Sequence, residues 1–302
     1  MTLAAPFPYF GGKRRAASRI WEALGDPSGY VEPFAGSAAV LLARPPFKGR
    51  RVETLNDADG WLVNTWRAIQ LSPDAVAAAA WGPAAEIDYH ARLAWLQARR
   101  TPDLVAWMEG DPEAHDPKAA GWWLYVLACG IGDPFGPGPW RVVDGHLRKL
   151  PHLGNAGRGQ LEDYMRQLAD RLRRVRITCG SWERVVKPSV TRSGTGGDGT
   201  RAIFLDPPYA TSGDLYAESS EGVALAVRDW CLSAPRELRV ILCGYDTEHD
   251  ALLAHGWSVT EGKAGRGAGY SVNPTNGRRE RLWLSSACIG SEQANLFAGV
   301  AP

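Results

Sequence analysis

The sequence predicts an α/β fold of the nucleotide-binding type, with a long helical segment inserted into its sheet. Residues 28–71 give a strand, a glycine turn, a helix, a second strand and an acid in that order, which is how such folds open. Apolar runs typical of buried strands return after residue 170, beyond a helical middle rich in Ala, Trp and Arg. These two observations together predict a sheet interrupted by an insertion.

The first part of the chain alternates strands and helices. We expect a strand at 28–36, a helix starting at 37–43, a strand at 51–57 and a helix at 58–71. Gly36 falls where the first strand turns into the first helix. A glycine there lets a ligand approach the backbone, and the helix start is expected to offer free amides. A tight structural turn is the alternative, because a lone glycine turn is a weak signal.

The middle of the chain, residues 72–170, reads as a helical subdomain broken by Gly- and Pro-rich stretches at 130–140 and 151–159. Strands then return, and a final pair that alternates polar and apolar residues suggests antiparallel strands at a sheet edge. The expected elements are strands at 174–180, 201–206 and 239–246, a helix at 221–234, and the edge pair at 257–263 and 279–285.

This organisation divides the chain into catalytic-type α/β parts at 1–71 and 171–288, a helical insert at 72–170 and a disordered tail at 289–302. The 302 residues are 45% hydrophobic with a formal net charge of +1, so overall charge does not announce a nucleic-acid partner. Five scattered cysteines lack zinc-ligand spacing and argue against a disulfide framework. We expect a reducing, cytoplasmic setting, with no membrane span and no signal peptide.

The stretch FLDPPYA (204–210) leaves a buried strand through an acid and then stiffens the backbone. Asp206 falls at the carboxyl end of the strand, where open α/β sheets bind ligands. Pro207 and Pro208 fix φ, so their carbonyls keep set directions, and Tyr209 adds a flat ring. Two acceptors and a ring suit an amino group on a base, since the acceptors draw the amine towards tetrahedral geometry and free its lone pair. A rigid structural turn is the alternative.

Asp57 follows Gly36 by 21 positions, where such folds place an acid that accepts hydrogen bonds from ribose hydroxyls. The competing explanation is that Asp57 caps the following helix. Both roles are compatible if the nearby Asp59 is the cap.

Four motifs occur in order: YFGGK (9–13), EPFAG (32–36), LND (55–57) and LDPPY (205–209). This ordered set, with a large segment ahead of the last motif, resembles the Dam-type DNA adenine methyltransferases over about residues 8–285. DPPY alone is shared with other amino-methyltransferases, whereas the ordered set is far more specific. The resemblance implies a Rossmann-like S-adenosylmethionine-dependent methyltransferase sheet with an inserted helical target-recognition region. The implied function is methyl transfer to the N6 amino group of a flipped adenine in double-stranded DNA.

The resemblance also implies residue roles, with S-adenosylmethionine as the methyl donor and direct transfer from sulfur to amine, without a covalent enzyme intermediate or a metal ion. The implied residues are Tyr9, Phe10, Gly12 and Lys13 at the methionine end and target pocket, Phe34, Ala35 and Gly36 in the cofactor turn, Asp57 at the ribose, Ser181 and Trp182 beside the cofactor's adenine, and Asp206, Pro207, Pro208 and Tyr209 at the target adenine, with Asp206 also at the cofactor.

The region that reads the DNA sequence departs from the family pattern. The asparagine-and-aromatic loop of GATC-reading members is missing, and residues 122–136 fill its slot, so GATC recognition is not implied. Most tryptophans in this segment are expected to pack in the core. Expected contacts to the DNA backbone lie in Arg-rich or Gly-rich stretches, at Arg158, Arg171, Arg174, Arg266 and Arg278.

The tail carries QANLF (293–297), which is similar to the Q-x-x-L-F peptides that bacterial proteins insert into the sliding clamp of DNA replication. Leu296 and Phe297 would fill an apolar pocket of the clamp, and Gln293 would anchor the backbone. Packing of the tail on the body is the alternative. We otherwise expect a monomer that acts on DNA in a bacterial cell or a phage-infected host.

Two alternatives to adenine methylation share the same motifs. Asp206 and Pro207 would also accept the N4 amino group of cytosine, although Asp at this position leans towards adenine by resemblance. A DNA-binding protein with a vestigial cofactor site is the other alternative, and a single cofactor-binding titration separates it from an enzyme. A small-molecule methyltransferase would not need an insert of roughly 100 residues, the size of a small domain. A stand-alone methylase and one that works beside a separately encoded restriction nuclease remain open.

Overall fold

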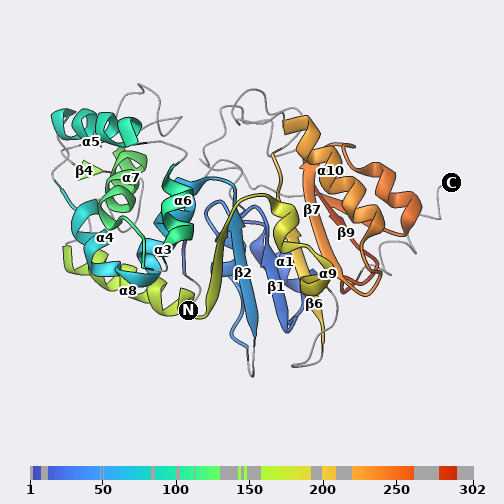
Figure 1. Cartoon of the computed structure of the whole chain (residues 1–302). Helices are drawn as coiled ribbons and strands as arrows, with labels where there is room; N and C mark the ends of the chain where they lie inside the picture. Colours follow the sequence, from blue (N-terminus) through green and yellow to red (C-terminus); the bar gives the residue numbers. More distant parts are fainter. Residues whose placement is uncertain are drawn as a thin grey trace.

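The computed structural model describes residues 3–7, 13–47, 49, 51–82, 86–99, 103–111, 113–129, 142–143, 146–147, 158–191, 199–208, 220–261 and 279–290. Within these residues a seven-stranded sheet has the order β5-β2-β1-β6-β7-β9-β8 (Figure 1). Its strands are β1 (Gly29–Glu32), β2 (Val52–Asp57), β5 (Val175–Cys179), β6 (Arg201–Leu205), β7 (Arg239–Tyr245), β8 (Ser258–Glu261) and β9 (Glu280–Leu284).

The centre of the sheet is parallel and its last two strands are antiparallel. β1 pairs in parallel with both β2 and β6, β2 with β5, and β6 with β7. β9 runs antiparallel to β7 and to β8. The chain builds outward from β1 in one direction and from β6 in the other, so the topological switch point lies between β1 and β6. In open α/β sheets, ligands bind outside the carboxyl ends of the strands at such a point.

Helices surround the sheet on both sides. They are α1 (Ala17–Leu24), α2 (Ala39–Leu42), α3 (Gly60–Leu71), α4 (Pro73–Ala80), α5 (Glu86–Arg99), α6 (Asp103–Gly110), α7 (Pro117–Cys129), α8 (Arg158–Leu172), α9 (Pro188–Thr191) and α10 (Ser220–Ser233), with 3₁₀ turns η1 (Trp182–Val185) and η2 (Asp250–His255) and a short pair β3 (Val142–Val143) and β4 (His146–Leu147). In Figure 1, α3 to α8 gather beside β2, and α10 lies at the β7–β9 side.

The predicted order of strands and helices is confirmed, including the antiparallel edge pair. The element ends differ by at most two residues, apart from the first strand, which ends four residues early because 33–36 form the glycine turn. The predicted helical middle contains α4 to α7 and most of α8, and α8 continues to Leu172. The proposed division into domains remains a prediction.

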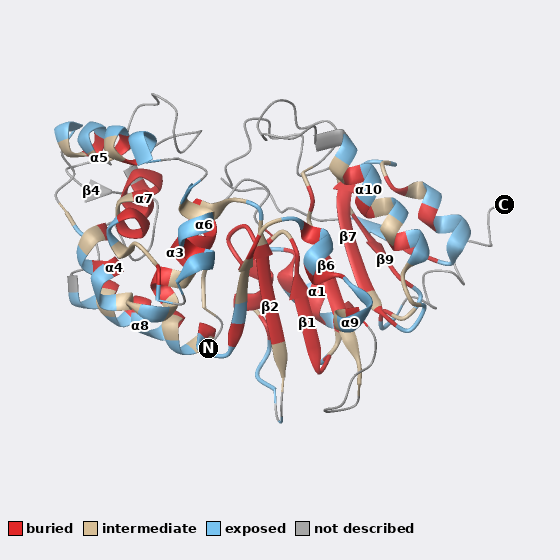
Figure 2. Ribbon diagram, viewed as in Figure 1, coloured by how far each residue is buried: buried red, intermediate tan, exposed pale blue. Residues whose placement is uncertain are grey.

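Among the described residues, the apolar cluster with the most members extends from the sheet into the helical layer, and two smaller clusters lie apart from it. Phe7 packs against Trp66 of α3, with ring centroids 5.4 Å apart, and against Trp123 of α7 at 4.8 Å. Trp123 is 3% exposed, so it packs in the core as expected for most of the tryptophans. Figure 2 shows buried residues along the strands and on the inward faces of the helices. These rings join the N-terminal segment to α3 and α7, since buried aromatic rings contribute large apolar contact areas.

In the described part of the chain, no helix has the length and apolar character needed to cross a membrane.

Candidate active site

The turn after β1 is fixed by bonds from β2 and α3. Gly36 has φ of +47°, a conformation that glycine adopts without the steric cost of a Cβ. Its N–H donates to Asp57 Oδ2 at 3.0 Å, and its carbonyl accepts from the indole N–H of Trp66 at 3.0 Å. The amide of Gly36 is therefore occupied, because the side chain at the end of β2 already binds it, whereas free amides at the start of α2 stay a prediction. The glycine turn and the acid form one unit.

Asp57 has the geometry of an acceptor that is only partly occupied. Its Oδ1 accepts from the N–H of Asp59 at 3.0 Å, and Asp59 itself caps α3 by accepting from the N–H of Trp61 at 2.8 Å. The capping role thus belongs to Asp59. Burial raises the pKa of Asp57 to about 6, while the backbone N–H groups of Asp59 and Gly36 oppose that rise. The backbone N–H of Ala58 contributes in the same direction. A carboxylate has about four lone-pair sites, so these backbone N–H groups leave some acceptor capacity.

Asn56 locks three strand ends together, a role that sequence reasoning missed. Its side-chain Nδ2 donates to the carbonyl of Pro33 after β1 at 3.0 Å and to that of Gly180 after β5 at 2.9 Å. Its Oδ1 accepts from the hydroxyl of Thr178 at 2.9 Å. Asn56 is 1% exposed, so these bonds form away from water, where an unmet polar group is costly. The sequence feature that could have indicated this role is the asparagine of LND (55–57), which stands between an apolar residue and an acid at the end of a strand.

Three aromatic residues near the turn, Phe34, Trp182 and Trp230, are in ring contact and form one side of the site. Phe34 is half-buried and stacks on Trp182, with ring centroids 6.2 Å apart and an interplanar angle of 29°. Trp182 is buried and also contacts Trp230 edge-on. Ser181 is exposed and its hydroxyl donates to Glu183. Phe34 is thus more exposed to solvent than Trp182, on which it stacks.

The acid of the DPPY motif lies in a buried cluster of charges. Lys13 Nζ is 2.8 Å from Asp206 Oδ1 and 2.8 Å from Glu280 Oε1, and the lysine side chain is only 3% exposed. Burial alone would lower the pKa of Lys13, but the charges of Asp206 and Glu280 outweigh it and raise the pKa well above its usual range. The cation therefore stays charged between the two carboxylates. Asp206 follows β6, and Glu280 is the first residue of β9.

The thiol of Cys243, on β7, adds a neutral contact to this cluster. It is fully buried, and burial raises its pKa well above the usual value, with the charge of Asp206 adding to the effect. It therefore stays protonated and hydrogen-bonds to Asp206. After Asp206 the chain continues through Pro207, which is buried, and Pro208, which is half-buried.

Residues 9–83 match the family model of D12 class N6 adenine-specific DNA methyltransferases. The match confirms the resemblance to Dam-type adenine methyltransferases and supports an adenine-specific DNA methyltransferase. The mostly parallel seven-stranded sheet fits the Rossmann-like methyltransferase fold, as predicted. No curated protein matches the chain. Lys13, the Gly36 turn and Asp57 lie inside the matched region, whereas Asp206 and Glu280 lie beyond it.

Several predicted methyltransferase residues lie outside the described part of the chain. They are Tyr9, Phe10 and Gly12 of the first motif, Tyr209 of the last, the expected DNA contacts Arg266 and Arg278, and the tail residues Gln293, Leu296 and Phe297. Arg158 begins α8, and its side chain is likewise not described.

The two remaining arginines of the expected DNA contacts differ in position. Arg174 is exposed just before β5 and stays a prediction. Arg171 is half-buried, and its guanidinium donates to both carboxylate oxygens of Glu53, at 2.7 and 2.9 Å, and to the carbonyl of Leu41. Arg44 binds the same carboxylate at 2.9 Å. The structure therefore ties Arg171 into an internal network, which argues against a contact with the DNA backbone.

A second buried acid ends β1. Glu32 is 2% exposed and accepts from the hydroxyl of Tyr30 at 2.6 Å. Burial raises its pKa to about 8, against the opposing effects of that hydroxyl and of the backbone N–H of Leu41. Glu32 is therefore mostly neutral at pH 7, and it supports the turn as a hydrogen-bonded group more than as a charge.

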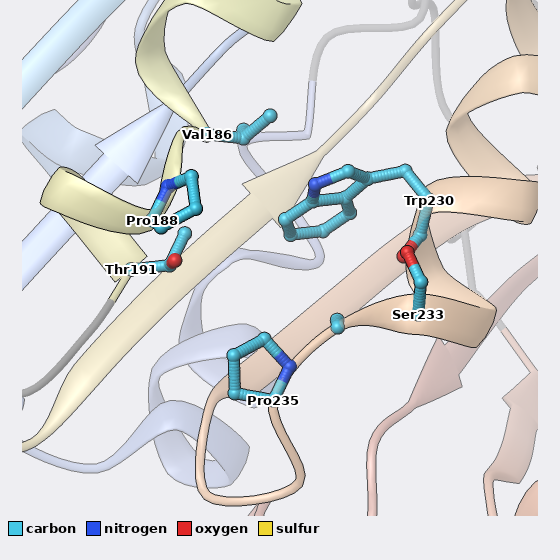
Figure 3. Close-up of a pocket in the computed structure, with 7 residues that line it drawn as sticks. Val186, Pro188, Thr191, Trp230, Ser233 and Pro235 are labelled. Atoms are coloured by element: carbon cyan, nitrogen blue, oxygen red, sulfur yellow. The ribbon is translucent and has the colours of Figure 1, made fainter.

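A pocket of about 250 Å³ lies apart from this edge, between α9 and the end of α10 (Figure 3). Trp230, whose ring contacts Trp182 edge-on, points into it together with Val186 and Pro188. The described residues that line it include no ionisable side chain. It provides neither an acid nor a base for chemistry.

Proposed function

We propose that this protein transfers a methyl group from S-adenosylmethionine to the N6 amino group of an adenine flipped out of double-stranded DNA. The observation that carries the proposal is the buried Lys13–Asp206 ion pair, 2.8 Å long, at the carboxyl end of β6. That end lies at the topological switch point of the sheet, beside the turn that joins Gly36 to Asp57. An acid aimed at a substrate therefore adjoins a turn suited to a nucleoside cofactor.

The residues of the turn fit S-adenosylmethionine. Asp57 keeps acceptor capacity for ribose hydroxyls after binding Gly36 and Asp59, and Phe34 offers a half-exposed ring to an adenine. When bound, the cofactor supplies a methyl group on a positively charged sulfur. The chain's task is to hold that group in line with the target amine and to exclude water.

Asp206 is suited to accept a hydrogen bond from the target amine. Lys13 engages its Oδ1, and the remaining lone-pair sites of a carboxylate can accept from an N–H of the amine. The carbonyl of Pro207 would accept the second N–H, which draws the nitrogen towards tetrahedral geometry and frees its lone pair. The nitrogen would gain a bond to the methyl carbon as the carbon–sulfur bond of the cofactor breaks, and it would give up one proton, which Asp206 is suited to receive.

The test is mass spectrometry of nucleosides from unmethylated plasmid DNA incubated with the protein and S-adenosylmethionine. We expect N6-methyladenine, and a loss of about 10³-fold in rate for Asp206→Asn, in the range of a lost acid–base group. Asp229→Asn, which changes an exposed acid on α10, should methylate as the wild type does.

The other outcomes of this experiment discriminate the alternatives. Detection of N4-methylcytosine would show that the target base is cytosine and not adenine. No methylated base, together with no binding of S-adenosylmethionine, would identify a DNA-binding protein with a vestigial site. A wild-type rate for Asp206→Asn would show that Asp206 does not take part in the reaction.

Cofactor affinity is expected to depend on pH through Asp57. Its carboxyl has a pKa of about 6, so it is ionised above that pH and protonated below it. Ribose hydroxyls donate best to the ionised form. We therefore expect S-adenosylmethionine to bind about ten-fold more weakly at pH 5 than at pH 7.5, since the ionised fraction falls by that factor.

Isothermal titration calorimetry across this pH range measures the effect. Asp57→Asn should bind weakly at every pH and show a flat profile. A wild-type affinity that is constant from pH 5 to 7.5 would show that Asp57 does not hold the cofactor in its ionised form.

A further inference from the structure

Glu280 occupies a position at the active edge that none of the sequence motifs contains. Its carboxylate is 2.8 Å from Lys13 Nζ, the same distance that separates Lys13 from Asp206. The side chain of Glu280 is 13% exposed and that of Asp206 is 20% exposed. One buried cation is thus divided between two carboxylates, and the cluster keeps one net negative charge.

The topology explains how a residue 74 positions after Asp206 reaches this edge. β9 runs antiparallel to β7, with Glu280 opposite Tyr245, the last residue of β7. An antiparallel strand begins where its parallel neighbours end. The first residue of β9 therefore lies at the carboxyl edge of the sheet, level with the residue that follows β6.

We propose that Glu280 is a positioning residue for methyl transfer, which acts through Lys13 on Asp206. This inference rests on the proposed function. Glu280 binds the same ammonium as Asp206 at the same distance, so it helps to fix where Lys13 meets Asp206 Oδ1. It also shares the positive charge, which leaves more negative charge on Asp206 to attract the target amine and to receive its proton.

Cys243 restrains the same carboxylate from a different strand. Its buried thiol bonds to Asp206 from β7, and Lys13 approaches from the segment before α1. Lys13 and Cys243 therefore both restrain Asp206, and Glu280 in turn holds Lys13. A structural role for Glu280 alone would be to neutralise Lys13, and it would affect folding without a selective effect on the chemical step.

The experiment compares Glu280→Gln with the wild type in single-turnover methylation at saturating DNA and S-adenosylmethionine. We expect the rate constant to fall about 10- to 100-fold, the loss typical of a misplaced reacting group. The dissociation constant of S-adenosylmethionine should stay within about three-fold, because Gly36 and Asp57 lie at the ends of β1 and β2, which β6 and β7 separate from β9, and because Lys13 keeps its partner Asp206. Glu261→Gln, an exposed acid on the neighbouring β8, is the matched control and should keep the wild-type rate.

A folded Glu280→Gln protein with the wild-type rate would overturn the proposal, as would equal losses in rate and cofactor affinity. If Glu280→Gln does not fold, Glu280→Asp retains the charge but withdraws it by one methylene, and it should slow the chemical step at unchanged cofactor affinity. A wild-type rate in Glu280→Asp would then overturn the proposal. Absence of methyladenine with the wild-type protein, in contrast, would overturn the proposed function itself.

Discussion

Lys13→Met should lower the free energy of unfolding by about 3–5 kcal/mol and abolish methyl transfer. The cost is typical of removing one partner from a buried ion pair. Lys13 is 3% exposed and is the cation between Asp206 and Glu280. Methionine of similar length fills the same space without the charge, so the two carboxylates would face each other uncompensated.

Denaturant unfolding followed by circular dichroism measures this loss. Lys187→Met, which changes an exposed lysine, is the control and should stay within about 0.5 kcal/mol of the wild type. Adding Asp206→Asn and Glu280→Gln to Lys13→Met removes both stranded charges and should recover much of the lost stability. A Lys13→Met protein as stable as the wild type would mean that the cluster contributes little to folding.

The site residues at the ends of the parallel strands could be predicted from the sequence, because the patterns that mark them are local. Gly36 comes shortly after β1, Asp57 ends β2 and Asp206 follows β6, so the end of a strand marks each position. Parallel strands bring such ends to one edge. Asp59 as the cap of α3 also followed from local rules.

Glu280 was missed because it begins its strand instead of ending or following it. A search for acids after strands cannot find the first residue of an antiparallel strand, although the edge pair itself was predicted. Cys243 was missed for another reason, since a thiol within a buried run is indistinguishable from a packing residue. Both roles depend on which strands are neighbours, which no local pattern records.

Arg171 shows the opposite error. A basic stretch at 171–176 suggested contacts to phosphate, but the guanidinium of Arg171 binds Glu53, a 5% exposed acid within β2. A buried acid requires a cationic partner, and α8 supplies one. The demand for that partner arises from tertiary burial of Glu53, which the charge pattern of the sequence does not reveal.

Asn56→Ala should weaken S-adenosylmethionine binding by more than about ten-fold and lower the free energy of unfolding by about 2–4 kcal/mol. The truncation leaves the carbonyls of Pro33 and Gly180 without their buried donor, and unsatisfied buried acceptors cost about 1–3 kcal/mol each. Both carbonyls belong to the turns that follow β1 and β5. The turn that carries Phe34 and Gly36 would lose the bond from Asn56 to Pro33 and would be held to β2 more weakly, by the bond from Gly36 to Asp57.

Asn64→Ala provides a matched comparison because Asn64 is also fully buried and also bridges backbone groups. Its side chain donates to the carbonyl of Asp116 at 3.1 Å and accepts from the N–H of Asp116 at 2.8 Å. This bridge joins α3 to the residue before α7, in the helical layer. Asn64→Ala should therefore cost comparable stability and leave cofactor affinity unchanged, as measured by calorimetry at a temperature where both variants are folded. Equal losses of affinity in the two variants would mean that general loosening of the fold weakens binding. A loss confined to Asn56→Ala would tie cofactor binding to the lock between β1, β2 and β5.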